Sequence, residues 1–279
     1  MVGVLGVSAS AILVRFSQAP SGVTAAYRLG WTVLLLLPVV LLRCRAELRR
    51  VTARDLVLCG ASGVLLALHF LTWFESLKRT SVASSTVLVS TEVIFTALGF
   101  ALFLHGKIPR LGVWAILLAF GGSALLALSG GGGAGELSGN LLALAAASAA
   151  AVYTLIGRIQ RGHLSTTVYT FLTYLACFLT LLLGTAAAGT PLTGYGGREW
   201  LIGLALAVLC TLLGHSLFSW CLKYLSPSYV SAAKLCEPVF SSLAAIPLFG
   251  EVPGPLQLAG GAAVLGAVLL YTWAERGKK

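Results

Sequence analysis

The sequence predicts an all-α integral membrane protein with ten transmembrane helices in two inverted repeats of five. The 279-residue chain is 58% hydrophobic and only 10% charged, with a mean hydropathy of +0.93. A soluble domain carries about 25% charged residues. Apolar runs recur along the whole chain, separated by short connections that hold Gly and Pro, and one segment of the first half is echoed in the second.

A spanning helix needs about 20 mostly apolar residues. Ten stretches meet this need: 2–18, 21–42, 56–74, 82–104, 111–128, 137–156, 166–188, 200–222, 227–249 and 256–273. Lipid offers no hydrogen bonds to an open strand, so helices are the only economical interpretation. The first run lacks a basic leader and an A-x-A cleavage site, so we interpret it as a span and not a signal peptide.

Lys and Arg are unevenly distributed over the connections. Most lie at 43–54, 107–110, 158–161, 223 and the C-terminal end, whereas the alternate connections hold only Arg15, Lys78, Arg79 and Arg198. The positive-inside rule therefore predicts a multi-pass protein of the cytoplasmic membrane with both termini in the cytoplasm. Topology explains the net charge of +10, so the lipid bilayer is the expected partner and nucleic acid is not.

The six cysteines are scattered, with no C-x-x-C pair, and most fall inside apolar runs. We interpret them as small buried hydrophobes, so neither disulfides nor a metal is expected. No nucleotide-binding loop is present, and no cofactor is expected.

An internal repeat supports the two-fold division. At a shift of 145 positions, LKRTSVASSTVLVSTEVIFTAL (77–98) echoes LKYLSPSYVSAAKLCEPVFSSL (222–243), and Glu92 falls on Glu237. Five helices in each half make the second half enter the membrane from the opposite side, as in many secondary transporters. The expected units are 1–129, a Gly-rich connector at 130–136, and 137–279.

Several motifs resemble the drug/metabolite transporter superfamily, EamA group. They are AAYRLG around Arg28, FESLKRTS at the end of the third span, and EPVF and FGE in the ninth. The resemblance covers essentially the whole chain and implies transport without fixing a substrate. One departure is visible. The fourth span has Val93 where the ninth has Pro238, which predicts a less kinked helix in the first half.

Ionisable residues inside spans are functional candidates because their burial is costly. Lys234 and Glu237 are three residues apart and share a helix face. Pro238 removes the backbone hydrogen bond to the carbonyl of Lys234 and predicts a kink there. The functional interpretation is a substrate or proton site near mid-membrane, and the structural alternative is a buried ion pair that joins helices.

Three further charged residues are candidates. Glu92 could pair with Lys234 or carry a coupling proton, because burial disfavours a charged carboxylate. Arg28 could clamp a substrate carboxylate or be satisfied structurally by its neighbours. Glu75, close to Trp73, could hold a cation among aromatic rings or lie at the headgroup level beside basic residues.

Aromatic side chains supply candidate cavity walls, namely Tyr153, Tyr169, Tyr174, Trp220 and Tyr229. Tyr and Trp also gather at membrane interfaces, so a belt role is the alternative. His215 lies inside the eighth span, where it could relay protons or be hydrogen-bonded in the packing.

These observations favour a secondary carrier of small polar metabolites that works by alternating access. Export of amino acids or their derivatives is what the resemblance implies, with the proton as a candidate coupling ion. The alternatives are uptake of a cationic metabolite such as a quaternary amine, and an intramembrane enzyme. The sequence has neither GxSxG nor HExxH, so we expect no enzyme and no catalytic residues. A monomer and a homodimer both remain open.

Overall fold

The protein is helical throughout the part of the chain that its structure describes. This computed structural model describes residues 2–103, 109–129, 134–225, 227, 230, 234 and 236–276. Strands are absent from these residues. An all-helical chain satisfies its backbone hydrogen bonds within each segment, as a lipid environment requires.

The described part of the first half contains seven helical segments. They are α1 (Val2–Phe16), α2 (Ser21–Arg43), α3 (Arg45–Leu48), α4 (Ala53–Arg79), α5 (Val82–Val89), α6 (Glu92–Phe103) and α7 (Arg110–Ser129). Side chains fix several starts. The Thr52 hydroxyl accepts from the Asp55 amide at 3.3 Å, and the Asp55 carboxylate accepts from the Thr52 amide at 3.0 Å. This reciprocal capping begins α4. Ser81 caps α5 in the simpler way, by accepting from the Ser84 amide at 3.1 Å.

The second half repeats the pattern. Its described segments are α8 (Ala134–Gln160), α9 (Thr166–Ala187), α10 (Gly197–Ala205), the π-helix η1 (Leu206–His215), α11 (Ser216–Cys221), α13 (Cys236–Phe249) and α14 (Pro255–Arg276). α10, η1 and α11 run on without a break and form the eighth span. Thr211 donates its hydroxyl proton to the Leu206 carbonyl five residues earlier at 3.2 Å, the spacing of a π-helix.

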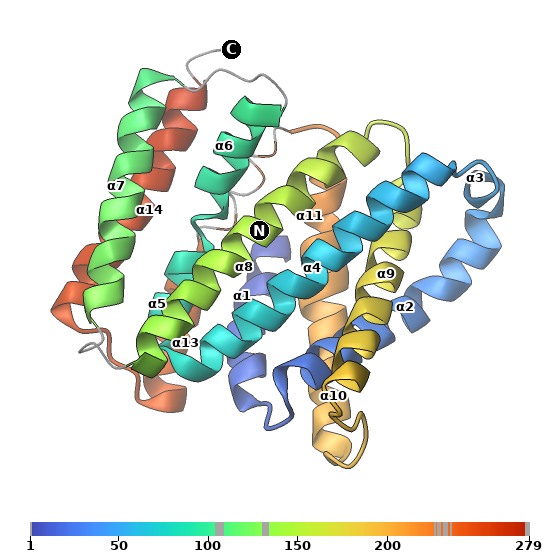
Figure 1. The fold of residues 1–279 in the computed structure, drawn as a ribbon, viewed down its shortest axis with the longest axis horizontal. Helices are drawn as coiled ribbons and strands as arrows, with labels where there is room; N and C mark the ends of the chain where they lie inside the picture. Colours follow the sequence, from blue (N-terminus) through green and yellow to red (C-terminus); the bar gives the residue numbers. More distant parts are fainter. Residues whose placement is uncertain are drawn as a thin grey trace.

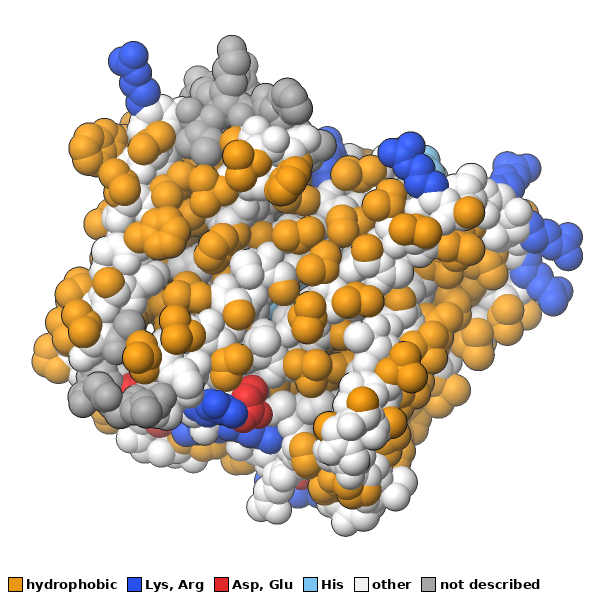
Figure 2. All heavy atoms as spheres, in the orientation of Figure 1, with side chains coloured by type: hydrophobic (Ala, Val, Ile, Leu, Met, Phe, Trp, Pro, Cys, Tyr) orange, Lys and Arg blue, Asp and Glu red, His pale blue; other side chains and the backbone are white. Residues whose placement is uncertain are grey.

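Ten apolar segments among the described residues match the ten predicted spans. Seven are long and apolar enough to cross a membrane, and three shorter apolar helices are Leu5–Phe16, Arg110–Leu126 and Glu237–Phe249. Figure 2 shows apolar side chains over most of one face, while charged side chains gather toward its edges. Large apolar side chains such as Leu102, Leu183 and Trp273 are more than two-thirds exposed, which suits a lipid-facing surface.

The two halves pack around a pseudo-two-fold axis. α4 packs on α8, and the pair that the axis relates to it is η1 on α1. α6 packs on α8, and its counterpart is α13 on α1. α2 with α9 and α7 with α14 are pairs that the axis maps onto themselves. α7 and α14 stand side by side at one edge of the molecule (Figure 1) and pack against the fourth span. The fold is thus the predicted inverted repeat of five spans.

The fourth span is broken, although a less kinked helix was expected there. α5 ends at Val89 and α6 begins at Glu92. The hydroxyl of Ser90 donates to the Thr86 carbonyl at 2.8 Å, and that of Thr91 donates to the Leu88 carbonyl at 2.7 Å. Such hydroxyls compete with the backbone and bend helices. The expectation from the missing proline was wrong, because two hydroxyls interrupt this helix just before the position that matches Pro238.

The described helix that carries Pro238 in the ninth span is α13. α13 starts at Cys236, so Pro238 is the third residue of the helix and lies in its first turn. Amides in a first turn have no partner within their helix, so a proline is tolerated there. The structure therefore places Pro238 at the start of α13, whereas the sequence predicted a kink at this proline inside a continuous helix.

Candidate functional site

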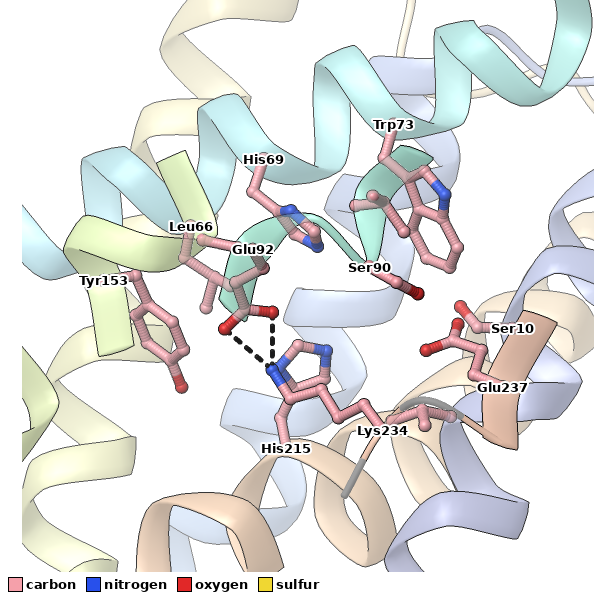
Figure 3. Close-up of a pocket in the computed structure, with 13 residues that line it drawn as sticks. Ser10, Leu66, His69, Trp73, Ser90, Glu92, Tyr153, His215, Lys234 and Glu237 are labelled. Carbon is pink, nitrogen blue, oxygen red and sulfur yellow. Dashed lines mark hydrogen bonds and ion pairs between the residues drawn. The ribbon is translucent and has the colours of Figure 1, made fainter. Parts of the chain in front are cut away.

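A buried polar cavity lies between the two halves, near the starts of α6 and α13. It has about 40 Å³ open to water-sized molecules, which is room for only a few waters at ~10–15 Å³ each. Residues from α1, α4, α8, η1 and the fourth and ninth spans line it (Figure 3). Its polar lining consists of Ser10, His69, Trp73, Ser90, Glu92, Tyr153, His215, Lys234 and Glu237.

The two carboxylates of the cavity occupy equivalent places in the two halves. Glu92 is the first residue of α6, and Glu237 is the second residue of α13. A helix N-terminus carries partial positive charge and unpaired amides, which favour a carboxylate there. Discontinuous helices whose ends meet at a central site are typical of transporters with inverted repeats. The 145-residue repeat thus becomes a pair of half-helices that start at one cavity.

Glu92 is paired with Lys234. The Lys234 ammonium lies 2.9 and 3.1 Å from the two carboxylate oxygens, and the Thr154 hydroxyl donates to the same carboxylate at 2.9 Å. The side chains of Glu92 and Lys234 are only 7% and 16% exposed. This pair joins the first half to the second, because Lys234 precedes α13 and Glu92 opens α6. The Lys234 ammonium also lies 5.4 Å from the centre of the Phe218 ring.

Glu237 has a different environment. The residue is 8% exposed and lines the cavity. Within the described part of the chain, neither a hydrogen bond nor an ion pair reaches its carboxylate. Figure 3 shows that this carboxylate lies among Ser10, Ser90 and Trp73, on the side away from Tyr153. Lys234, three residues earlier, is directed to the Glu92 carboxylate of the other half instead.

Arg28 lies beside the cavity and does not line it. It is fully buried on α2, donates from Nε to the Thr211 hydroxyl at 2.7 Å, and donates from Nη1 to the Ser10 hydroxyl at 3.1 Å. Its guanidinium carbon lies 4.2 Å from the centre of the Phe70 ring. Arg28 therefore reaches the cavity through Ser10.

Tyr153 and His215 line the cavity as candidate walls. The Tyr153 hydroxyl lies 3.2 Å from the Ser219 hydroxyl. His215 is the last residue of η1, and Figure 3 shows its ring beneath the Glu92–Lys234 pair. π-helical turns are frequent at functional sites, and here the turn ends at a cavity residue.

Two other tyrosine candidates pack behind the cavity. Tyr169 and Tyr174 are fully buried on α9 and do not line it. The Tyr169 hydroxyl lies 3.0 Å from that of Ser62, and the Tyr174 hydroxyl 3.2 Å from that of Ser216. Both tyrosines tie α9 to neighbouring spans.

The structure separates Trp220 from the cavity. Trp220 is 50% exposed and packs on Tyr224 with ring centres 5.0 Å apart. Tyr229, the remaining aromatic candidate, lies outside the described residues.

Glu75 and Trp73 do not form the expected cation site. Trp73 is 3% exposed and lines the cavity. Glu75 pairs with Arg79 one turn later at 2.8 Å and accepts from the Ser21 hydroxyl at 2.9 Å, near the end of α4. Two residues along a helix are about 200° apart around its axis, so neighbours in sequence face opposite ways.

Sequence reasoning passed over His69, Ser10 and Ser90. His69 binds the Ala146 carbonyl through Nδ1 at 3.0 Å, and its ring lies 6.3 Å from that of His215. A signal was present, because His69 and His215 fall one position off the 145-residue shift. Single serines in apolar helices give no comparable pattern.

The two ends of the molecule carry related arginines. Arg15 donates to the Leu77 carbonyl, and Arg158 donates to the Leu222 carbonyl, which lies 145 positions from Leu77. We call the end with Arg15 the Arg15 end and the opposite one the Arg158 end; they lie at the lower and upper ends of the helices in Figure 1. Each arginine thus caps the last turn of a neighbouring span.

Only the Arg15 end adds a carboxylate to this arrangement. Arg15 also binds Glu251 at 2.5 Å, and Glu251 accepts from the Val82 amide at 2.8 Å. We call this cluster of Arg15, Glu251 and the Val82 amide the latch. Among the described residues, Arg158 has no carboxylate partner, and the position that matches Glu251 is Gly106, which lies outside them.

Comparison with known proteins agrees with this architecture. The model of the EamA-like transporter family matches residues 1–128 and 137–273. The pseudopaline exporter CntI of Pseudomonas aeruginosa (strain UCBPP-PA14) is 24% identical over 215 residues, covering 77% of this chain and 74% of its own. The "Probable terminal-alkyne amino-acid exporter" of Streptantibioticus cattleyicolor is 27% identical over 242 residues, covering 83% and 78%.

The likeness extends to three dimensions. One solved crystal structure with 18% sequence identity has a TM-score of 0.69 over 97% of this chain and 94% of its own. The fold and the cavity between the halves define a multi-pass membrane transporter. The chain belongs to the EamA-like transporter family, of the drug/metabolite transporter type. The names of the family and of these relatives are those of transporters and not of enzymes.

Proposed function

We propose that this protein exports amino acids or their derivatives across the cytoplasmic membrane by alternating access. One observation carries the proposal: a buried cavity made by both halves holds an ammonium paired with one carboxylate, and a second carboxylate that has no partner among the described residues. Positively and negatively charged groups inside a membrane protein cost free energy to bury, and together they suit the binding of a small charged solute. The exporter names of two relatives, one of them an amino-acid exporter, support the same substrate class.

Lys234 is the proposed carboxylate-binding residue. Its ammonium already holds the Glu92 carboxylate at 2.9 Å, so a substrate carboxylate would replace a group of the same chemistry. Glu92, once released from Lys234, would be a buried carboxylate without the lysine beside it, and burial favours the protonated form of such a group. Glu92 is therefore our candidate for the residue that carries a coupling proton. His215, whose ring lies beneath the pair, is a second candidate for this role.

Alternating access is supported by the ends of the molecule. The latch joins α1 and the start of α5 to the residue that follows α13, and so closes the Arg15 end across both halves. The Arg158 end lacks the corresponding acid among the described residues. With the cavity too small for an amino acid, this arrangement suits a contracted state from which rocking of the halves would widen the site.

The proposal includes two further features of the organisation that the sequence predicts. They are the cytoplasmic location of both termini, which the distribution of Lys and Arg favours, and the division into 1–129, a connector at 130–136, and 137–279. The oligomeric state is open between monomer and homodimer. Uptake of a cationic metabolite is the second candidate function. The Glu237 carboxylate, which has no partner among the described residues, supports it and takes the cation-binding role that the sequence suggested for Glu75.

Counterflow in proteoliposomes tests the proposal. Purified protein is reconstituted, vesicles are loaded with each member of an amino-acid panel, and entry of the same labelled compound is followed. The wild type should exchange at least one amino acid, Glu237→Gln should lose exchange with a near-normal folded yield, and Glu75→Gln should retain it.

No exchange of any amino acid by folded wild-type protein would contradict export of this class. Exchange of quaternary amines alone would favour the cationic candidate. Conversion of a compound without any gradient would instead indicate an intramembrane enzyme.

A further inference from the structure

The pseudo-two-fold axis gives the cavity two carboxylates but only one lysine. Lys234 has apolar Val89 at the matching position of the first half, so no second ammonium comes from the repeat. The lysine binds Glu92 and leaves Glu237 without a hydrogen-bonding or ionic partner among the described residues. A carboxylate without such a partner, on a residue that is only 8% exposed, is costly, and it is retained most easily where a ligand completes it.

The groups around Glu237 offer acceptors in addition to its own oxygens. Ser90 donates its only hydroxyl proton to the Thr86 carbonyl at 2.8 Å, so its oxygen can only accept further hydrogen bonds. Figure 3 shows this oxygen and the Glu237 carboxylate on the same side of the cavity.

The indole of Trp73 lies above these oxygens in the same view. An aromatic face next to a carboxylate attracts a cation. An ammonium group has three donors and no acceptor, so two or more oxygens beside an aromatic ring suit it.

Arg28 does not neutralise this place by direct contact. Its Nε and Nη1 donate to Thr211 and Ser10, and its guanidinium lies over Phe70. Its long-range attraction lowers the cost of the Glu237 charge without occupying the acceptor positions that face the cavity.

We propose that Glu237, Ser90 and Trp73 form a subsite for a primary ammonium group of the substrate, next to the lysine that takes its carboxylate. The inference rests on the proposed function and deepens it: the cavity would select a zwitterionic head group. The ammonium is about the size of water, which suits a cavity with room for a few waters. A trimethylated nitrogen would need more room.

The test uses three matched probes with the same branched side chain. They are leucine, 4-methylpentanoate, which lacks the amino group, and 3-methylbutylamine, which lacks the carboxylate. Dissociation constants are measured by calorimetry on the purified full-length protein in detergent. We expect wild-type protein to bind leucine about tenfold or more tightly than 4-methylpentanoate, the usual size of a charge-assisted hydrogen bond.

Two variants locate this preference. Glu237→Gln should weaken leucine binding about tenfold and leave 4-methylpentanoate binding unchanged, so that the preference disappears. Ser90→Ala should reduce the preference about threefold without removing it, and it keeps the test available if Glu237→Gln does not fold. Glu75→Gln is the matched control and should bind all three probes like the wild type.

Three results would overturn the subsite. They are equal weakening of leucine and 4-methylpentanoate by Glu237→Gln, no preference for leucine in the wild type, and no binding of any probe. Because binding in detergent needs no transport, these results are distinct from failure of the proposed function. Amino-acid counterflow with an unaltered preference in Glu237→Gln would overturn the subsite alone.

Discussion

The two halves of this transporter put a carboxylate at the same place and surround it differently. Glu92 opens α6 and is held by Lys234 and Thr154, whereas Glu237 opens α13 and has neither an ionic nor a hydrogen-bonding partner among the described residues. The arginines at the two ends differ in the same way, since Arg15 has Glu251, whereas among the described residues Arg158 binds only carbonyls. A symmetric scaffold therefore carries asymmetric charge, and we propose that the difference separates groups that hold the halves together from groups that bind a ligand.

The largest expected effect tests the difference between the two carboxylates. Glu92→Gln leaves the Lys234 ammonium buried without its carboxylate, so the free energy of unfolding should fall by about 3–5 kcal/mol. Glu237→Gln removes an unpaired charge and should change it by less than about 1 kcal/mol. SDS-induced unfolding of the purified variants measures both values.

The double variant Glu92→Leu/Lys234→Met is the control for this comparison. It removes the whole pair, so most of the lost stability should return. Equal losses for Glu92→Gln and Glu237→Gln would contradict the division of roles.

Proline substitutions test whether the two helix starts are equivalent. Val93→Pro copies the second half into the first turn of α6 and should cost about 1 kcal/mol, mainly from lost packing of a buried side chain. Ala97→Pro, one turn later, should cost about 3 kcal/mol or more because it breaks an interior hydrogen bond. The same unfolding assay measures both. If both substitutions cost the same, α6 does not begin at Glu92.

The latch at the Arg15 end should show a smaller effect on stability and a clear effect on access. Glu251→Gln weakens charged hydrogen bonds to Arg15 and the Val82 amide, so the loss should be about 1–2 kcal/mol. A cysteine at Ser90 should then react about tenfold faster with a thiol reagent added at the Arg15 end, the change that a shift of about 1.4 kcal/mol gives. Unchanged access would mean that the latch does not close this end.

The smallest effect is expected at Glu75. Its partner Arg79 lies on the same helix and the pair is partly exposed, so Glu75→Gln should cost no more than about 0.5 kcal/mol. Access to Ser90→Cys from the Arg15 end should stay unchanged, which separates an acid within one helix from the acid of the latch. A tenfold gain in access would place Glu75 among the closing contacts.

The architecture could be predicted from the sequence because it depends on apolar length and on the 145-residue repeat. The broken fourth span could not, because Ser90 and Thr91 interrupt a helix through hydroxyl bonds whose effect depends on tertiary context. The free-energy cost of burying charge inside a span made Lys234, Glu92 and Glu237 candidates from the sequence, and the structure brings these residues to one cavity. Whether they bind substrate stays a prediction.

The aromatic candidates were harder to sort. Tyr153 lines the cavity while Tyr169 lies behind it, and both are buried on apolar helices. Where all faces of a helix are apolar, the sequence does not show which face is turned to the centre. His69 was overlooked for a different reason, because its match to His215 is one position off the 145-residue shift.

Side-specific labelling tests alternating access around this cavity most directly. Ser90→Cys is introduced into a variant without native cysteines and reconstituted in one orientation, and a membrane-impermeant thiol reagent is added to either side. The account predicts labelling from both sides, slowed from both by a transported amino acid. Labelling from one side only, or labelling that no transported amino acid slows, would contradict it.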